Sequence, residues 1–381
     1  MKIIIVGTAY PYRGGLAAFN GRLSQEFVKE GHEVEIYTFT VQYPSFLFPG
    51  KTQYSTDKAP ENLKITRKIN SVNPANWIRV GNEIREKNPD LVIFCYWISF
   101  MAPCFGSIAG RIRRNKNITC IGLIHNMIPH EPNILDKLLP GYFVKSMQGF
   151  ITLSQSVILD INKFDRKNKP KSFSPHPIYD HYGKKLSRQE ALKELALDDS
   201  FRYVLFFGFI RAYKGLDLLL EAFGENKIKE RNIKLLVAGE FYENEEFYKD
   251  KIKQLEIGDK VMLYSDFIPD DRVNLFFSAA DIIAQPYKTA TQSGVTQIAY
   301  HFEKPMLVTN VGGLPEIVPH GKVGYVVEPD PSEIASALAD FYDMEREKEF
   351  VSNILVEKEK YSWSTMVNAI LSLKERIGTG K

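Results

Sequence analysis

Two cations and two glycines lie close together in "FFGFIRAYKGLDLLLEAF", residues 206–223. An apolar run reaches Gly208, and Arg211 and Lys214 follow before Gly215 opens an amphipathic run. A cation near a core is costly unless an anion meets it, and glycine lets a ligand approach the backbone closely. A helix that begins here would add free N–H groups and a favourable dipole. The stretch predicts a diphosphate-binding loop; a solvated Lys and Arg at an ordinary turn is the alternative.

A second candidate phosphate site lies in "ATQSGVTQIAYHFEKP", residues 290–305. Ser293 is a favoured helix N-cap and opens the helical run "GVTQIAYHF". We expect the amides of Gly294 and Val295 to bind the β-phosphate together with the two cations. An ordinary serine cap is the alternative, and both interpretations can hold at once.

Short β-rich runs alternate with longer helical runs along the whole chain. The first series is "KIIIVG", "EVEIYTF", "LVIFCYW", "TCIGLIHN" and "GFITLS"; the second is "RYVLFFG", "IKLLVAG", "KVMLYSDF", "DIIAQPY" and "PMLVTN". Such alternation predicts parallel sheets covered by helices on both faces. Two series predict two doubly wound domains, with a boundary near residues 172–187. Ligands bind such sheets beyond the carboxyl ends of the strands, which is where the 208–215 loop would lie.

The composition is that of an ordinary globular protein, because 25% of the 381 residues are charged and 44% are apolar. The three cysteines have no metal-ligand spacing and cannot all pair, which favours a reduced, cytosolic chain. The first apolar run is too short for a signal peptide, so we expect no export. The sequence has no Asp-x-Asp element and no cluster with metal-ligand spacing, so it predicts no metal site.

Residues 91–110 contain no charge and are long enough to span a membrane. The Asn-Pro-Asp turn at 88–90 and the proline at 103 instead favour a buried strand over 91–96 followed by a buried helix. Charge is uneven: residues 1–178 hold 23 Lys and Arg against 13 Asp and Glu, a net +10, and residues 179–381 carry a net −7. The basic half would suit anionic lipid or phosphate, unless the split is chance surface composition.

The second half resembles the nucleotide-binding domain of family-4 retaining glycosyltransferases. The resemblance rests on "FGFIRAYKGLDLLLEAF", "LLVAGE", "DFIPDDRVNLFFSAADIIAQPY" and "KPMLVTNVGGLPEIV", and "GGL" at 14–16, "LIHN" at 123–126 and "YSW" near the last helix fit the same family. It implies an α/β fold of the GT-B type: two facing Rossmann-like domains with a C-terminal helix crossing back to the first domain. The implied ranges are an acceptor-side domain at 1–178, a nucleotide-sugar-binding domain at 179–360 and the returning helix at 361–381.

The resemblance also implies roles for single residues. Arg211, Lys214 and His125 are expected to serve the reaction, with the histidine near the donor sugar, although a histidine at a strand end is often structural. Expected donor contacts are Gly15, Gly208, Gln292, Ser293, Gly294, Val295, Gln297, Phe267 and Ile268; expected acceptor-side residues are Gly14, His130 and Glu131.

Two departures from the family pattern stand out. Phe209 occupies the usual position of the family's arginine, which comes at Arg211 here. The usual pair of glutamates falls on Ala290 and Ile298, or in the other alignment on Thr291 and Ala299. The usual carboxylate contacts to ribose and sugar therefore have no counterpart, and the polar candidates nearby are glutamine and serine side chains.

The sequence thus predicts a retaining, metal-independent transferase that moves a hexose-type sugar from a nucleotide diphosphate to an acceptor hydroxyl in bacterial-type polysaccharide or glycolipid assembly. The donor is a substrate and no cofactor is expected. The expected partners are a carbohydrate or lipid-linked acceptor and an anionic membrane surface, not nucleic acid. The expected location is the cytoplasm, either free or at the inner face of the membrane. A GT-B-like nucleotide-sugar epimerase and a non-catalytic nucleotide-sugar binder are the alternatives.

Overall fold

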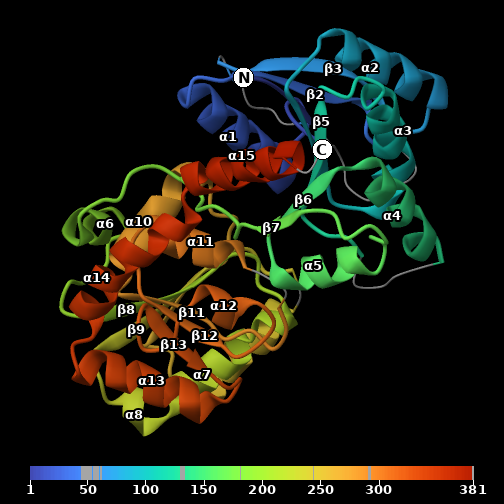
Figure 1. Cartoon of the computed structure of the whole chain (residues 1–381). Helices are drawn as coiled ribbons and strands as arrows, with labels where there is room; N and C mark the ends of the chain where they lie inside the picture. The colour runs from blue at the N-terminus through green and yellow to red at the C-terminus, as the bar shows by residue number, and fades with distance from the viewer. Residues whose placement is uncertain are drawn as a thin grey trace. The chain divides into compact units, whose positions relative to one another are not determined.

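The computed structural model describes residues 1–43, 54, 60, 62–128, 134–180, 182–242, 244–290 and 293–379. The chain forms two compact units: Met1–His176 together with Trp363–Lys381, and Pro177–Ser362. The C-terminal helix thus belongs to the first unit (Figure 1).

The first unit is built on a seven-stranded parallel sheet in the order β3-β2-β1-β4-β5-β6-β7. Its strands are β1 (Lys2–Val6), β2 (Glu33–Val41), β3 (Lys64–Asn70), β4 (Leu91–Tyr96), β5 (Thr119–Ile124), β6 (Gly149–Thr152) and β7 (Lys171–Phe173). Every residue of β4 and β5 is buried, which explains their uninterrupted apolar sequences.

Helices cover both faces of this sheet. They are α1 (Gly15–Lys29), α2 (Pro74–Glu86), α3 (Ala102–Ile112), α4 (Ile134–Ser146), α5 (Gln155–Asn162) and α15 (Trp363–Thr379), with the short η2 (Ser99–Met101) before α3. α1 and α15 share one apolar cluster and lie side by side, whereas α2, α3, α4 and α5 pack on the other face (Figure 1). Residues 91–110 form β4 and most of α3, as expected, and no helix among the described residues is long and apolar enough to cross a membrane.

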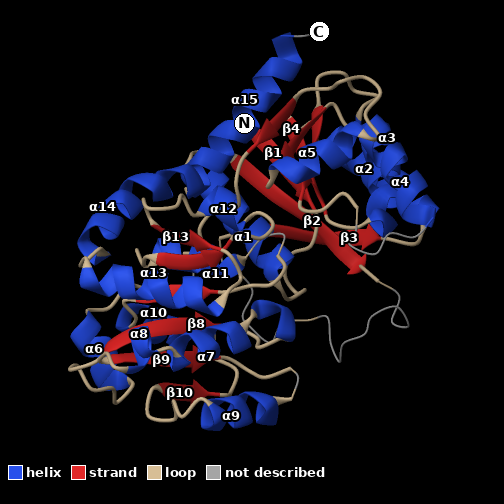
Figure 2. Cartoon of the chain, turned by 90° about the horizontal axis from the view of Figure 1, so that it is seen from below, coloured by secondary structure: helices blue, strands red, loops and turns tan. Residues whose placement is uncertain are grey.

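The second unit contains a six-stranded parallel sheet in the order β10-β9-β8-β11-β12-β13. Its strands are β8 (Arg202–Phe207), β9 (Ile233–Ala238), β10 (Val261–Tyr264), β11 (Ile282–Gln285), β12 (Met306–Thr309) and β13 (Gly324–Val327). Its helices are α6 (Arg188–Glu194), η3 (Ala212–Lys214), α7 (Leu216–Gly224), α8 (Asn226–Lys229), α9 (Glu245–Gln254), η4 (Asp270–Arg272), α10 (Val273–Ala279), α11 (Gly294–His301), α12 (Leu314–Ile317), α13 (Pro331–Asp343), α14 (Glu347–Glu357) and η5 (Lys358–Tyr361). Helices again lie on both faces, in two separate apolar clusters (Figure 2).

The expected fold class is confirmed, because both sheets are parallel and sandwiched by helices. Three strands were not expected from the sequence: β3, β7 and β13. β3 is an edge strand with five charged or polar residues in "KITRKIN", and only one of its residues is buried. β7 and β13 are three and four residues long, too short for a period-2 pattern to stand out.

Candidate active site

The carboxyl ends of β8 and β9 meet closely just before the two cations. The Gly208 amide donates to the Ala238 carbonyl at 2.9 Å, and Gly208 has a φ of 95°. A Cβ atom on Gly239 would lie 2.4 Å from the Gly208 carbonyl oxygen. Only glycine fits at position 239, and with Gly208 opposite it, the ends of the two strands present backbone without side chains.

The loop from β8 to α7 is fixed against the end of β11. Gly215 has a φ of 69°, and a Cβ atom there would lie 1.9 Å from the Pro286 carbonyl oxygen. The Lys288 amide donates to the Tyr213 carbonyl at 2.7 Å, and the Lys288 ammonium pairs with Asp217 at 2.6 Å. These contacts hold the short η3 turn, which carries Lys214, in one position.

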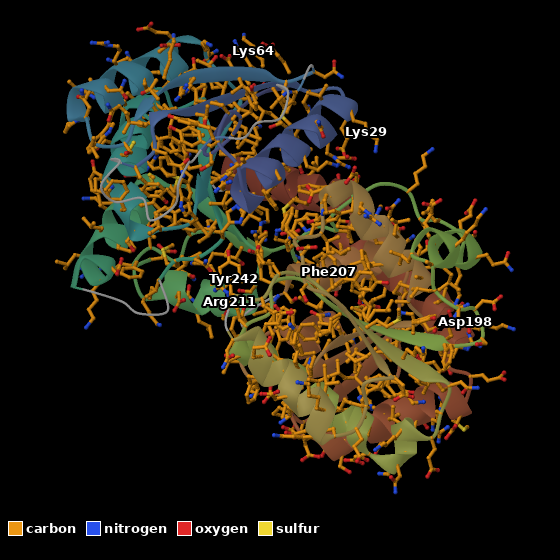
Figure 3. The ribbon with its side chains drawn as sticks, turned by 180° about the vertical axis from the view of Figure 1, so that it is seen from behind. Lys29, Lys64, Asp198, Phe207, Arg211 and Tyr242 are labelled. Atoms are coloured by element: carbon orange, nitrogen blue, oxygen red, sulfur yellow. The ribbon has the colours of Figure 1, made fainter. Side chains whose placement is uncertain are left out.

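Arg211 and Lys214 both follow β8 at this end of the sheet. The Lys214 ammonium is 3.1 Å from where a Gly208 Cβ would be, and burial, aided by the charge of Arg211, lowers the pKa of Lys214 to about 8. The Arg211 guanidinium lies 4.5 Å from the ring centre of Tyr242, and Figure 3 shows the two side chains together. Within the described parts of the chain, neither cation pairs with a carboxylate. An anion bound here would offset the cost of burying the lysine.

A pocket of about 160 Å³ opens beside Gly208. Its lining residues are Tyr182, Phe207, Gly208, Phe209, Ala238, Gly239, Glu240, Phe267, Ile268, Asp270 and Val273. The Phe209 ring lies 6.3 Å from Phe267 in a stacked arrangement and 4.8 Å from Tyr242 edge to face, and all three rings are exposed. Exposed aromatic faces beside a polar rim suit a flat, partly polar ring system.

The N-terminus of α11 is the third component at this end of the sheet. The Ser293 hydroxyl accepts from the Val295 amide at 3.2 Å, so the predicted serine cap is present. The Val295 amide donates to the serine cap in this structure, and its binding of phosphate stays a prediction. The Gly294 amide has no acceptor among the described residues. A Cβ atom on Gly294 would lie 2.9 Å from the Tyr179 ring, which covers this helix end.

His125 follows β5 in the first unit and lies against Phe19 of α1, with 4.8 Å between ring centres. Phe19 also contacts His176 at 5.1 Å and Trp363 of α15 at 5.2 Å. Burial, with a smaller effect from His176, lowers the pKa of His125 to about 3, so the ring is neutral at neutral pH. Its Nε2 atom is buried and has no hydrogen-bond partner in the described part of the chain. A neutral imidazole with one unused nitrogen can hydrogen-bond a hydroxyl group.

Comparison with known proteins places the chain in a family. Residues 187–354 match the model for glycosyl transferases group 1, and residues 13–179 match the model for glycosyltransferase family 4. The chain belongs to the family-4 type of GT-B glycosyltransferases. An uncharacterized glycosyltransferase of Methanocaldococcus jannaschii is 25% identical over 98% of this chain and 97% of its own length.

One further relative and one solved structure are also similar to the chain. The N-acetyl-alpha-D-glucosaminyl L-malate synthase of Bacillus anthracis is 23% identical over 86% of this chain and 84% of its own length. An Anabaena protein solved in complex with UDP-glucose shares the fold, with a TM-score of 0.62 and 14% identity over 100% of this chain and 99% of that one.

The glycosyltransferase brings most of the predicted donor residues of its second unit to one end of the sheet. Gly208, Phe267 and Ile268 line one pocket, and Lys214 and Val295 approach Gly208, the latter with a methyl group 4.0 Å from the Gly208 Cβ position. Gln297, unlike these residues, is buried: it is only 2% exposed, and both polar atoms of its amide lack a partner within the described residues. His130, Glu131 and Gln292 lie outside the described residues.

The glutamate positions of the family are occupied by residues that cannot replace them. Ile298 and Ala299 of α11 belong to the apolar core of the second unit, and Ala290 packs against it. Thr291 lies outside the described residues. The described part of the glycosyltransferase contains no group of three His, Cys, Asp or Glu side chains that could hold a metal ion.

Four residues of interest were missed by the sequence analysis. Three of them are loop residues: Tyr242 contacts Arg211, Tyr179 contacts Gly294, and His176 contacts Phe19. Each is far along the chain from the residue that it contacts, so local sequence patterns do not reveal the contact. Gln285 ends β11 as a buried amide with neither polar atom partnered among the described residues. A polar residue closing the apolar strand "DIIAQPY" was the only signal for it in the sequence.

Proposed function

We propose that the protein is a retaining glycosyltransferase that moves a sugar from a nucleotide-diphosphate sugar to an acceptor hydroxyl without a metal ion. The supporting observation is the pair of cations, Arg211 and Lys214, which lack a carboxylate partner among the described residues, with the Lys214 ammonium beside the bare backbone of Gly208. Fixed cations lower a barrier when negative charge develops next to them. The β-phosphate of the donor would take that place.

The aromatic pocket is assigned to the nucleoside of the donor. A base would stack on Phe267 or Phe209, and the backbone around Ile268 would read its edge. The Glu240 and Asp270 carboxylates at the rim could accept hydrogen bonds from ribose hydroxyls or from ring N–H groups. An Anabaena relative of the same fold was solved with UDP-glucose, which supports a nucleotide sugar as the donor class.

In the proposed reaction the acceptor oxygen forms a bond to the anomeric carbon while the bond from that carbon to the β-phosphate oxygen breaks. The acceptor proton passes to the departing phosphate, so the products are a glycoside and a nucleoside diphosphate. Arg211 and Lys214 would stabilise the diphosphate as it departs. His125 is neutral, and its Nε2 has no hydrogen-bond partner among the described residues; we propose that it hydrogen-bonds a hydroxyl of the sugar.

The acceptor class is a carbohydrate or a lipid-linked carbohydrate, and the proposed setting is polysaccharide or glycolipid assembly. The first test is a thermal-shift screen of the full chain against nucleotide sugars and nucleoside diphosphates, because a ligand that binds only the folded state raises the melting temperature. The best donor is then incubated in radiolabelled form with candidate acceptors, with and without EDTA.

Transfer of label that persists in EDTA, with retained anomeric configuration, is the expected result. Interconversion of the nucleotide sugar without an acceptor would identify an epimerase instead. Binding without turnover over a broad acceptor panel would identify a non-catalytic binder. Activity that EDTA abolishes and manganese restores would contradict the metal-independent mechanism.

A further inference from the structure

One surface of the first unit gathers cations around an exposed part of α4, remote in sequence from the residues assigned to the donor. We define the α3–α4 basic face as Arg113, Arg114, Leu138, Tyr142, Lys145 and Lys169. Figures 1 and 2 both show α3 and α4 side by side. The face combines positive charges with exposed apolar side chains, and the stability of the fold does not require that combination.

Contacts at the end of α4 bring these residues together. The Arg113 guanidinium donates to the Ser146 carbonyl at 3.2 Å, and the Lys169 ammonium donates to the Val144 carbonyl at 2.6 Å. These two cations satisfy the last carbonyls of α4 and complement its dipole. Burial lowers the pKa of Lys169 to about 8; the nearby Asp165 carboxylate opposes this shift, and the positive charges of Arg113 and Lys167 add to it.

Other cations of the face have no such role. Arg114 and Lys145 are exposed, and neither side chain bonds a carboxylate or a carbonyl within the described residues. Clustered like charges repel one another. An anionic surface would relieve that repulsion.

Exposed apolar side chains lie among these charges. Leu138 is 68% exposed and Tyr142 is 47% exposed, and they stand four residues apart on α4, on the side that also presents Lys145. The Tyr142 ring is held against Gly106, and its hydroxyl lies 3.1 Å from the Ser107 hydroxyl. A fixed tyrosine with an adjacent leucine suits the boundary between lipid headgroups and acyl chains.

We propose that the α3–α4 basic face docks the protein reversibly on an anionic phospholipid membrane. Charge complementarity favours an anionic partner, and the exposed leucine favours lipid over nucleic acid, whose backbone offers no apolar region to it. The inference goes beyond sugar transfer and does not depend on it.

The test is flotation of the full chain with vesicles of phosphatidylcholine, with and without about a third of phosphatidylglycerol. Binding is expected only with the anionic lipid, and it should weaken strongly between ionic strengths of about 0.01 and 0.15 M, where the Debye length falls from about 30 to about 8 Å. Arg114→Glu with Lys145→Glu should lower the partition coefficient at least about tenfold, since each cation near the surface contributes about 1 kcal/mol.

A matched control makes the same change of net charge elsewhere. Lys193→Glu with Lys348→Glu alters two exposed lysines of the second unit that have no carboxylate partner among the described residues, and it should leave most of the binding intact. Leu138→Ser should weaken binding several-fold at fixed charge, whereas Val356→Ser, at a similarly exposed site of the second unit, should not.

Three results would overturn the proposal: no flotation at low ionic strength, equal loss in the control pair, or displacement by single-stranded RNA that binds more tightly than the vesicles. Neither donor nor acceptor is present in this experiment. Its failure therefore leaves the proposed transfer reaction untouched, and inactivity of the enzyme would leave this result standing.

Discussion

The first loop of each sheet leads from a buried strand into a helix, yet the two loops are built in different ways. After β8, Gly215 is pressed against the Pro286 carbonyl, with 1.9 Å between that oxygen and a Cβ position. After β1, the Cβ positions of Gly14 and Gly15 have no described heavy atom within 4 Å. Packing therefore requires a glycine at Gly215, whereas the Cβ positions of Gly14 and Gly15 meet no described atom at the start of α1.

The comparison separates a glycine that is required by packing from glycines that could let a ligand approach the backbone. In the second unit, Gly215 lets the loop pack closely, so that Lys214 is held in position before a ligand binds. Cations that are positioned in this way can stabilise negative charge that develops in a reaction. In the first unit the open space is available to a ligand, although Gly14 still needs its φ of 102°. The neighbouring titratable groups differ too: Lys214 has a pKa lowered to about 8 and His125 one lowered to about 3.

The largest effect is expected at the packed loop. Gly215→Ala should destabilise the protein by about 3 kcal/mol or more, because the added methyl group meets the Pro286 carbonyl and the backbone conformation is strained as well. Urea unfolding measures this difference. A variant as stable as the wild type would show that the loop can move and does not hold Lys214 rigidly.

Gly15→Ala is the matched change in the open loop. Since Gly15 does not adopt a positive φ and its Cβ position is open, the variant should be as stable as the wild type or more stable by about 0.5 kcal/mol. A loss of donor or acceptor affinity in this stable variant would show that the open space is used by substrate. Unchanged kinetics would remove Gly15 from the site.

The next effect concerns acid stability through His125. Its pKa in the folded state lies below the ordinary value, so the unfolded state binds more protons once the pH falls below about 6.5. Stability is therefore lost as the pH falls. Between about pH 7 and pH 4.5 the wild type should lose on the order of 2 kcal/mol more than His125→Phe, which keeps an aromatic ring against Phe19. Parallel stability curves for the two proteins would contradict the buried, neutral state of this histidine.

A smaller effect is expected from Lys214. Only its charged form attracts a diphosphate, and its pKa in the free protein is lowered to about 8. The affinity for a nucleoside diphosphate should fall about tenfold between about pH 7 and pH 9, as the ammonium loses its proton. Calorimetric titration at several pH values measures this affinity. The Lys214→Arg variant is the control, because an arginine stays charged over that range. Equal pH dependence in both proteins would assign the titration to another group.

Much of the fold could be predicted from the sequence, because buried parallel strands are continuous apolar runs. "KIIIVG" and "LVIFCYW" proved to be β1 and β4, and the uncharged 91–110 segment divided into strand and helix. β3 could not be recognised in the same way, because an edge strand exposes most of its side chains and carries charges instead.

The parts of the candidate site that could be predicted are those formed by residues close together in the sequence. The loop from Gly208 to Gly215 and the serine cap at Ser293 follow from residues that are neighbours in the chain. The aromatic contact of Tyr242 with Arg211 does not, because it joins residues after two different strands. The hydrogen bond from the Val295 amide to the Ser293 hydroxyl adds a detail that the sequence could not give, because a sequence shows that a cap is possible but not which N–H group it binds.

The central claim is that Arg211 and Lys214 hold and stabilise the diphosphate of the donor. The most direct measurement compares sugar transfer by Lys214→Ala, by Arg211→Ala and by the double variant, with Lys193→Ala plus Lys348→Ala as the control pair. Each single change should reduce transfer on the order of 100-fold, or ~3 kcal/mol, and the double loss should be less than additive if both cations act on one phosphate group. Arg211→Lys should restore only part of the activity, because the fork geometry is lost. Turnover close to that of the wild type in a folded double variant would contradict the account.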